Sequence, residues 1–313
     1  MKVVAGAGRE DIALVYIAEA EKGKFIEFVE SVQPPIPREQ KWVLIVSTLF
    51  GCPVGCKICD CGSHYGGKLS RDEILFQIDY LVTKRFPDRK VPVKKFKIQF
   101  ARMGEPSFNH NVLDVLESLT EIYDAPGLIP SISTIAPNGA DNFLEKLLEI
   151  KRRKFPKSFQ FQFSIQTTDE KLRDWLIPAK KWSFSKMAKY GNRFFDIGGR
   201  KIALNFALAD GMPIEPDILL QHFSPDIFLI KITPVNPTYR ANMNNISSVL
   251  TSQKWNEIVR TMQTAGYEVI LSIGELEENR IGSNCGQYVT AYRQAQAKVE
   301  GGYSYELQRL QKV

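Results

Sequence analysis

Short apolar runs alternate with helical patterns along most of this chain. From residue 42 onward, runs dense in Val, Ile and Phe are typical of strands that are covered on both faces. Between these runs, apolar residues recur at helical spacing, and Ser70 with Glu73 forms a capping box ahead of one such segment. We expect strands at Trp42–Thr48, Lys95–Ala101, Ile129–Ile135, Phe159–Gln166, Ile202–Ala207 and Ile227–Thr233.

This alternation predicts βαβ units and a parallel sheet. The fold class is therefore α/β, and six strand–helix units suggest a partial (β/α)6 TIM-like barrel rather than a closed barrel of eight. Ligands bind such folds at the C-terminal ends of the strands. We expect three parts: a short N-terminal extension (1–40), the barrel core (41–250) and a C-terminal helix–strand–helix segment (251–313).

The two outer parts carry their own patterns. The extension holds two short β-like runs, Ile12–Ala18 and Lys24–Val32, followed by a stiff connector rich in proline. The C-terminal segment predicts a helix at Trp255–Gly266, a strand at Tyr267–Ile273 and a basic helix at Gln287–Lys298.

Composition narrows the class of protein. The 313 residues are 44% hydrophobic and 24% charged, which is ordinary for a globular chain. No apolar run approaches the roughly 20 residues that a bilayer requires, and no signal peptide is evident, so we expect no membrane association and a cytoplasmic location. The net charge of +6 permits a polyanionic partner. Basic runs such as 151–154 fall at predicted helix C-termini, where they would complement the helix dipole or follow phosphates.

The cysteines indicate a metal or redox site. Four of the five lie within Cys52–Cys61 and the fifth is Cys285, an odd and crowded set that does not suit a disulfide framework. Cys52, Cys56 and Cys59 follow the first predicted core strand in a turn rich in Gly and Pro, and this spacing allows three thiolates to bind one cluster. A structural zinc site remains open, because Cys61 could supply its fourth ligand.

The C-x3-C-x2-C spacing after this strand resembles the radical S-adenosylmethionine (SAM) superfamily. The resemblance implies a [4Fe–4S] cluster on Cys52, Cys56 and Cys59, with SAM on the open iron. One-electron reduction by an external donor of the flavodoxin or ferredoxin type would then cleave SAM to a 5′-deoxyadenosyl radical. Ile58 stands where the superfamily usually has an aromatic residue.

Motifs at the later strand ends resemble the RlmN/Cfr family, which methylates an adenine carbon in large-subunit ribosomal RNA. Met103–Pro106 resembles the family's Met-Gly-Glu-Pro, and Phe163–Gln166 stands in place of its Leu-Ser-Leu-His. Ser133 begins a Ser-Thr step, and Pro234–Pro237 resembles Pro-Phe-Asn-Pro. The resemblance, from about residue 25 to about residue 290, implies SAM contacts by Gly104, Glu105, Ser133, Ser164, Ile165, Gln166 and Asn236.

Cys285 lies in a Cys-Gly-Gln context that resembles the family's methyl-carrying cysteine. The resemblance implies that one SAM methylates Cys285, and that a second SAM forms the radical that abstracts hydrogen from this methyl group. Glu30 resembles the family's general base, although the match requires a two-residue insertion. The family's further cysteine, seven residues before the first cluster ligand, is Ile45 here, and Cys61 stays unassigned.

Three functions remain open at this point. The leading one is methyl transfer of the RlmN/Cfr type through Cys285, onto RNA or a smaller acceptor. The second is a non-methylating radical SAM enzyme that acts on a small molecule or peptide, with Cys285 as hydrogen-atom donor. The third, from another class, is an RNA-binding or regulatory protein that holds zinc or a cluster and has no turnover.

Overall fold

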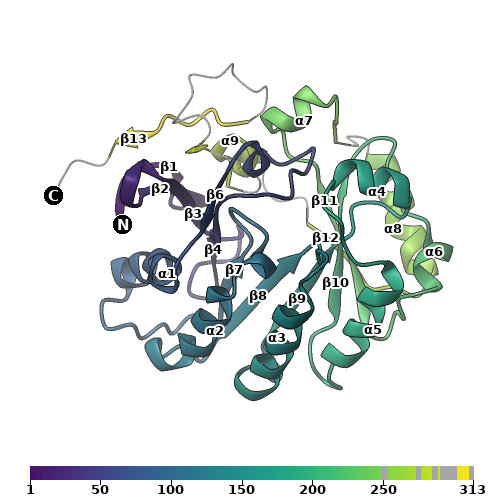
Figure 1. Cartoon of the computed structure of the whole chain (residues 1–313), viewed down its shortest axis with the longest axis horizontal. Helices are drawn as coiled ribbons and strands as arrows, with labels where there is room; N and C mark the ends of the chain where they lie inside the picture. The colour runs from purple at the N-terminus through teal and green to yellow at the C-terminus, as the bar shows by residue number, and fades with distance from the viewer. Residues whose placement is uncertain (249–251, 273–275, 284–287, 290–301, 310–313) are drawn as a thin grey trace.

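One large sheet organises the molecule in the computed structural model, which describes residues 1–248, 252–272, 276–283, 288–289 and 302–309 (Figure 1). Its strands lie in the order β12-β11-β10-β9-β8-β7-β4-β3-β2-β1-β13, and β5 and β6 form a separate hairpin. The strands are β1 (Lys2–Arg9), β2 (Ala13–Glu19), β3 (Phe25–Ser31), β4 (Lys41–Val46), β5 (Leu49–Gly51), β6 (Tyr65–Lys68), β7 (Lys95–Phe100), β8 (Leu128–Thr134), β9 (Gln160–Ser164), β10 (Ile202–Leu208), β11 (Phe228–Pro234), β12 (Val269–Leu271) and β13 (Gln308–Arg309).

The parallel part of the sheet confirms the α/β prediction. The six expected core strands are β4, β7, β8, β9, β10 and β11, and each pairs in parallel with its neighbour. The sheet is larger than six strands, because β12 adds in parallel to β11. This strand had been expected in the C-terminal segment, and its pairing makes it a continuation of the barrel sheet.

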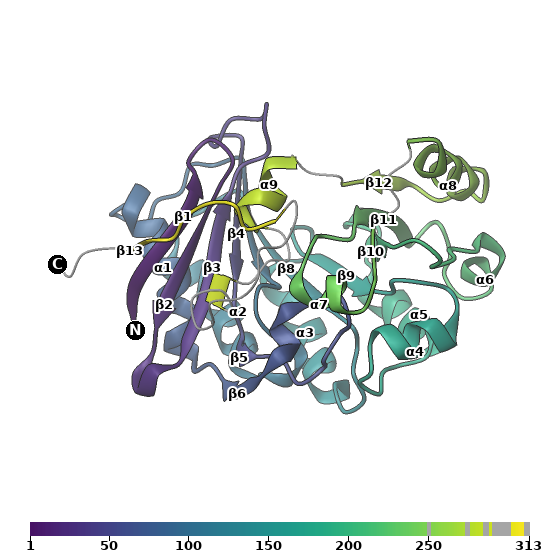
Figure 2. The same cartoon turned by 90° about the horizontal axis from the view of Figure 1, so that it is seen from above.

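The N-terminal residues extend the same sheet on its other side. The strand β3 pairs antiparallel with β4, β2 pairs with β3, and β1 pairs with β2. The two expected β-like runs match β2 and β3, whereas β1 was not predicted because its alternating Ala and Gly residues lack a strand's usual β-branched pattern. Figures 1 and 2 both show β1–β3 at one side of the molecule, with α6 and α8 at the other.

Helices cover the outer side of the curved sheet, where Figure 1 shows α1, α2, α3 and α5. The helices are α1 (Arg71–Arg85), α2 (Asn111–Ile122), α3 (Asp141–Lys154), α4 (Glu170–Leu176), α5 (Phe184–Phe194), α6 (Pro216–Leu220), α7 (Tyr239–Met243), α8 (Ser252–Thr264) and α9 (Leu276–Ile281), with short 3-10 turns at Glu21–Gly23, Asp60–Ser63 and Pro106–Phe108. Within the described part of the chain, no helix is long and apolar enough to span a bilayer.

Side-chain alternation defines two faces of the sheet. Phe161 and Phe163 of β9 pack against Tyr190 of α5, so they point outward to the helices. Successive residues of a strand point to opposite faces. Gln162 and Ser164 therefore point to the other side, which we call the inner face. Two polar residues of the inner face, Ser133 and Ser164, lie at the C-terminal ends of β8 and β9, where the candidate site is built.

The predicted capping box begins α1. The Ser70 hydroxyl accepts from the Glu73 backbone N–H at 3.2 Å, and the Glu73 carboxylate accepts from the Ser70 backbone N–H at 2.8 Å. We expect Ser70→Ala to lower the free energy of unfolding by about 1 kcal/mol, because a helix N–H loses its acceptor. Urea unfolding measures this, with Arg71→Ala as the matched control on the same exposed turn. An equal loss in both variants would contradict the assignment.

The C-terminal predictions are confirmed only in part. The expected helix at Trp255–Gly266 is α8, which begins three residues earlier, at Ser252. The expected basic helix at Gln287–Lys298 lies outside the described residues, except for Tyr288 and Val289. The helix α9 was not predicted, and it packs against β1 and β2.

Candidate active site

The three predicted ligand cysteines lie on one loop directly after β4. The hairpin of β5 and β6 encloses residues 52–64, which we call the cysteine loop. The Cys52 backbone N–H donates to the carbonyls of Cys61 and His64, at 2.8 and 3.1 Å. Gly51 has φ = +83°, and a Cβ at this position would lie 1.8 Å from the His64 carbonyl oxygen. The hairpin therefore closes around the loop only because residue 51 is glycine.

The thiols of Cys52, Cys56 and Cys59 lie close enough to affect one another. Burial raises the pKa of Cys52 to about 12, and the backbone N–H groups of Val54 and Glu105 oppose this shift. Burial, followed by the charges of Cys59 and Cys52, raises the pKa of Cys56. In such poorly solvated surroundings, thiolates require a cation or a metal centre to stabilise them. The donor set therefore fits a metal cluster.

Cys61 belongs to the same loop and supports Cys59. It is buried, and its Sγ lies 3.4 Å from the carbonyl oxygen of Arg102. A hydrogen bond with Cys61 lowers the pKa of Cys59. Among the described residues, no three His, Cys, Asp or Glu side chains are arranged to hold a single metal ion.

Buried apolar side chains pack against the cysteine loop. They form a cluster apart from the main core, and Cys52, Cys56 and Ile58 pack against it. Ile135 of this cluster follows β8 and Val235 follows β11, so the loop faces the C-terminal ends of distant strands. The surroundings have a low dielectric constant, which strengthens electrostatic interactions with any charged group bound there.

The helix α7 holds the cysteine loop in place through hydrogen bonds. The Asp60 carboxylate accepts from the Arg240 backbone N–H at 2.9 Å and from the Tyr303 hydroxyl at 3.0 Å. The Arg240 guanidinium donates to the carbonyls of Gly55 and Gly62, at 3.1 and 3.3 Å. Sequence reasoning missed Asp60 and Arg240, because their partners lie about 180 residues away along the chain.

Glu105, predicted to bind the SAM amine, is held by the protein itself. One carboxylate oxygen accepts from the Thr134 hydroxyl at 2.5 Å and the Ser107 hydroxyl at 2.7 Å, and the other accepts from the Ile135 N–H at 3.0 Å. Burial raises the pKa of this carboxyl. At Gly104, φ is +99° and a Cβ would lie 2.5 Å from the Leu49 side chain. The motif therefore joins the ends of β7, β8 and β5, and contact with SAM stays a prediction.

Three buried polar atoms at this edge lack a hydrogen-bond partner among the described residues. They are Ser133 Oγ, Asn205 Oδ1 and Asn236 Oδ1. Asn205 pairs in register with Ser164, so both lie on the inner face. Sequence reasoning singled out all of these except Asn205, whose signal was a lone polar residue in the middle of an apolar strand. Buried polar atoms without partners are rare and costly, which indicates that a ligand completes the site.

Ile165 and Gln166 link the ends of two strands. Their backbone N–H groups donate to the Asn205 carbonyl, at 2.9 and 3.1 Å, and Gln166 adopts φ = +72°. The Gln166 side-chain oxygen accepts from the Ala207 N–H at 2.6 Å. Gln166 thus orients the end of β10, and its predicted contact with SAM remains untested.

Glu30 lies on the helix side of β3, not on the inner face. Its carboxylate contacts the Arg85 guanidinium at 2.6 Å, the Tyr16 hydroxyl at 2.9 Å and the Trp42 indole N–H at 3.2 Å. These contacts do not support the general-base role, which stays a prediction. Glu27, three residues earlier, points to the opposite face and was missed. Ile45 lies between Leu44 and Val46, which face the helices. Like Glu27, Ile45 therefore points to the inner face.

Cys285 lies outside the described residues, which stop at Ser283 before it and resume at Tyr288 after it. Ile281 and Ser283 before it are buried, as are Tyr288 and Val289 after it.

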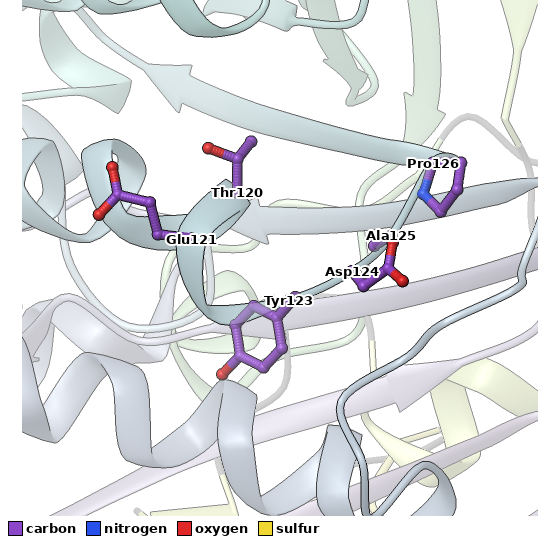
Figure 3. A pocket seen from close by; sticks show the side chains of 6 residues that line it. All are labelled: Thr120, Glu121, Tyr123, Asp124, Ala125 and Pro126. Atoms are coloured by element: carbon purple, nitrogen blue, oxygen red, sulfur yellow. The ribbon is translucent and has the colours of Figure 1, made fainter.

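Two other surface features stand apart from this site. A pocket lined by Thr120, Glu121 and residues 123–126 lies where α2 ends and β8 begins (Figure 3), at the N-terminal edge of the parallel strands. None of the predicted site residues lines it. The basic run 151–154 occupies the last turn of α3, which confirms its placement at a helix C-terminus; Lys151 donates to the Phe194 carbonyl at 2.9 Å and Arg153 pairs with Glu117.

The chain is similar to known methyltransferases in sequence and in fold. No family model matches it. A curated relative from Prochlorococcus marinus (strain NATL1A), named probable dual-specificity RNA methyltransferase RlmN, is 28% identical over 245 residues, which cover 73% of this chain and 65% of the relative. A relative of the same name from Chlorobium phaeobacteroides (strain BS1) is 26% identical over 294 residues, 87% of this chain and 74% of its own length.

The crystal structure of a radical SAM methyltransferase from Sphaerobacter thermophilus shares the fold, with a TM-score of 0.70 and 17% identity over 92% of this chain and 81% of that protein. The chain thus spans 65% of the length of the Prochlorococcus marinus relatives that it matches. The resemblance seen in the motifs is confirmed: the chain is similar in sequence to proteins named as RlmN methyltransferases, and it shares the fold of a radical SAM methyltransferase.

Proposed function

We propose that this chain is a radical SAM enzyme that transfers a methyl group in the manner of the RlmN/Cfr family, with Cys285 as methyl carrier. Cys52, Cys56 and Cys59 would hold a [4Fe–4S] cluster, and SAM would bind at the adjoining strand ends. When bound and reduced by an external donor, these cofactors would supply a 5′-deoxyadenosyl radical.

One observation carries the proposal. Ser133, Asn205 and Asn236 are buried polar groups with open hydrogen-bonding capacity, and they lie at the same strand edge as a loop that bears three close thiols. A polar ligand with several donors and acceptors would satisfy them. SAM offers an amine, a carboxylate, ribose hydroxyls and an adenine ring, so its chemistry fits this set.

The chain's own residues would divide the remaining tasks. The apolar cluster around Cys52 and Cys56 would exclude water from a reactive radical. In the methyl-transfer step, the Cys285 thiol gives up its proton, and its sulfur takes the methyl group from the sulfonium, leaving S-adenosylhomocysteine. The relatives are named as RNA methyltransferases, which makes RNA the first substrate to test.

One observation favours the non-methylating alternative. Ile45 points inward where the family carries a second reactive thiol, and Cys61 is buried against Arg102 and cannot take that place. A radical enzyme that uses Cys285 only as hydrogen-atom donor would need no second thiol. Product analysis separates the two: methyl transfer yields S-adenosylhomocysteine together with 5′-deoxyadenosine, and the alternative yields 5′-deoxyadenosine alone.

Removal of one open hydroxyl tests the ligand site. We expect Ser133→Ala to change the free energy of unfolding by less than about 0.5 kcal/mol, because Ser133 Oγ has no partner to lose. The same variant is expected to bind SAM about tenfold more weakly, in line with one lost hydrogen bond to a charged or polar ligand. Calorimetric titration of the anaerobic, reconstituted protein measures this. Ser131→Ala, on the same strand, is the control, and unchanged SAM affinity in Ser133→Ala would contradict the site.

A further inference from the structure

Several carbonyl groups of the cysteine loop are turned toward α7 and the two residues that flank this helix. Four loop carbonyls accept hydrogen bonds from three side chains of residues 238–244. The donors are Thr238 Oγ1 to the Ile58 carbonyl at 2.9 Å, the Arg240 guanidinium to the Gly55 and Gly62 carbonyls at 3.1 and 3.3 Å, and Asn244 Nδ2 to the Lys57 carbonyl at 3.1 Å. The proposed function assigns no task to these three side chains.

These contacts also fix the direction of N–H groups in the loop. A trans peptide unit is planar, with its C=O and N–H bonds on opposite sides. The peptide units that carry the carbonyls of Gly55, Lys57 and Ile58 therefore direct the N–H groups of the following residues away from α7. One of these N–H groups, that of Cys56, hydrogen bonds to the Cys56 thiol itself.

Backbone N–H groups reach the other two predicted ligand thiols as well. The N–H of Val54 hydrogen bonds to the thiol of Cys52, and the N–H of Cys61 to that of Cys59. Hydrogen bonds from N–H groups stabilise negative charge on sulfur, and in iron–sulfur proteins such bonds help to set the reduction potential. The loop thus presents donors to the thiols, and donors of residues 238–244 bind the carbonyls whose partial negative charge would oppose a bound anion.

Asp60 binds α7 to the loop in return. It directly follows Cys59, and its side chain is buried. Its carboxylate accepts from the Tyr239 and Arg240 backbone N–H groups, at 3.3 and 2.9 Å. Segments about 180 residues apart in sequence therefore hold each other in both directions, and neither can shift without breaking hydrogen bonds of the other.

We propose that Thr238, Arg240 and Asn244 are positioning residues, which hold the loop carbonyls against α7 and thereby keep the loop N–H groups on the ligand thiols. The proposal rests on the proposed function for the cluster that these thiols would hold, and on the contacts above for the orientation of the loop. Without the three donors, the peptide units would turn, the negative charge of the cluster would be less well stabilised, and iron would be lost faster.

Hydrogen exchange of the metal-free chain tests the positioning without any turnover. Exchange of the backbone amides is followed by mass spectrometry on peptides that cover the cysteine loop. We expect Thr238→Val to speed this exchange about tenfold, because one lost hydrogen bond eases local opening. Thr238→Ser keeps the hydroxyl and should restore slow exchange. Met243→Gln, which alters an 82% exposed side chain of the same helix, should exchange like wild type.

Asn244→Leu provides a second test that leaves Thr238 intact. It removes the donor to the Lys57 carbonyl, and it decides the question if Thr238→Val does not fold. Equal exchange of the loop in wild type, Thr238→Val and Asn244→Leu would overturn the proposal, as would an increase of the same size in Met243→Gln.

The reduction potential separates the orientation of the N–H groups from mechanical support of the loop. Thr238→Val and Asn244→Leu change no charge, so a shift in potential does not report a lost ion. After anaerobic reconstitution and without SAM, we expect both variants to have a more negative midpoint potential and to lose iron to a chelator about tenfold faster. Thr238→Ser should match wild type in both measurements.

The outcomes distinguish this proposal from the proposed function. Faster exchange with an unchanged midpoint potential would contradict the positioning of the N–H groups. If the wild-type chain takes up no iron on reconstitution, the proposed function fails, and the exchange rates still decide whether Thr238 and Asn244 hold the loop.

Discussion

Replacing Cys56 with alanine is expected to remove the iron–sulfur cluster and all SAM cleavage. Cys56 is one of three thiols on the cysteine loop, and burial together with its neighbours' charges raises its pKa, so without a metal it stays neutral. Removing one of three ligands removes a direct bond to the cluster. This should weaken metal binding by more than the roughly 10- to 100-fold seen when residues that only hydrogen bond to the ligands are replaced. The loss of the cluster is measured by the iron content and the visible absorbance of the protein after anaerobic reconstitution.

Cys61→Ala is the matched control. Cys61 hydrogen bonds with Cys59 and lies against the Arg102 carbonyl, so its loss removes a support and not a ligand. We expect this variant to keep its iron. A four-thiol zinc site predicts instead that both variants lose their metal equally, and that outcome would contradict the three-ligand account.

Arg102→Met is expected to destabilise the protein by about 3–5 kcal/mol. The substitution leaves Glu27 buried without its cation, and such broken pairs carry a large penalty because the remaining charge is not solvated. It also leaves the Gly282 and Ser283 carbonyls without their donor. Urea unfolding of the metal-free chain measures the change. Arg153→Met, which breaks an exposed pair with Glu117, should cost about 1 kcal/mol or less.

The loss of stability in Arg102→Met should also depend on pH. Burial raises the pKa of Glu27, so the folded chain binds this proton more tightly than the unfolded chain. A raised carboxyl pKa means that stability falls as pH rises through the range between the unfolded and folded pKa values. Removal of Arg102 raises the folded pKa further, so the variant should be closest to wild type at acidic pH. Additivity of Arg102→Met and Glu27→Leu, in place of partial recovery in the double variant, would contradict direct coupling.

The parallel strands could be predicted because burial on both faces leaves continuous apolar runs in the sequence. The strand β1 could not, since its Gly and Ala residues are placed by pairing with β2 and not by their own propensity. The short helix α7 was also missed, because its position depends on Asp60 and the cysteine loop, far away in the chain. The local hydrophobic pattern thus predicts the elements that bury their own apolar faces. Elements such as β1 and α7 depend on contacts with distant parts of the chain and cannot be predicted in this way.

In the candidate site, too, some features could be predicted from local sequence and others depend on distant contacts. The spacing of Cys52, Cys56 and Cys59 reports directly on a shared loop, because ligands close in sequence must be close in space. Glu30 and Glu27 illustrate the opposite case: both are glutamates on β3, and only strand alternation together with the Arg85 and Arg102 contacts shows which one faces inward. Motif resemblance selected Glu30, whereas the structure places Glu27 against Arg102 and the backbone of Val289.

Product analysis after anaerobic reconstitution with iron and sulfide, followed by SAM and a strong reductant, tests the proposed methyl transfer most directly. We expect 5′-deoxyadenosine and S-adenosylhomocysteine from the wild-type chain, with a methyl mass increment on Cys285. A protein with full iron loading that forms neither product would contradict it.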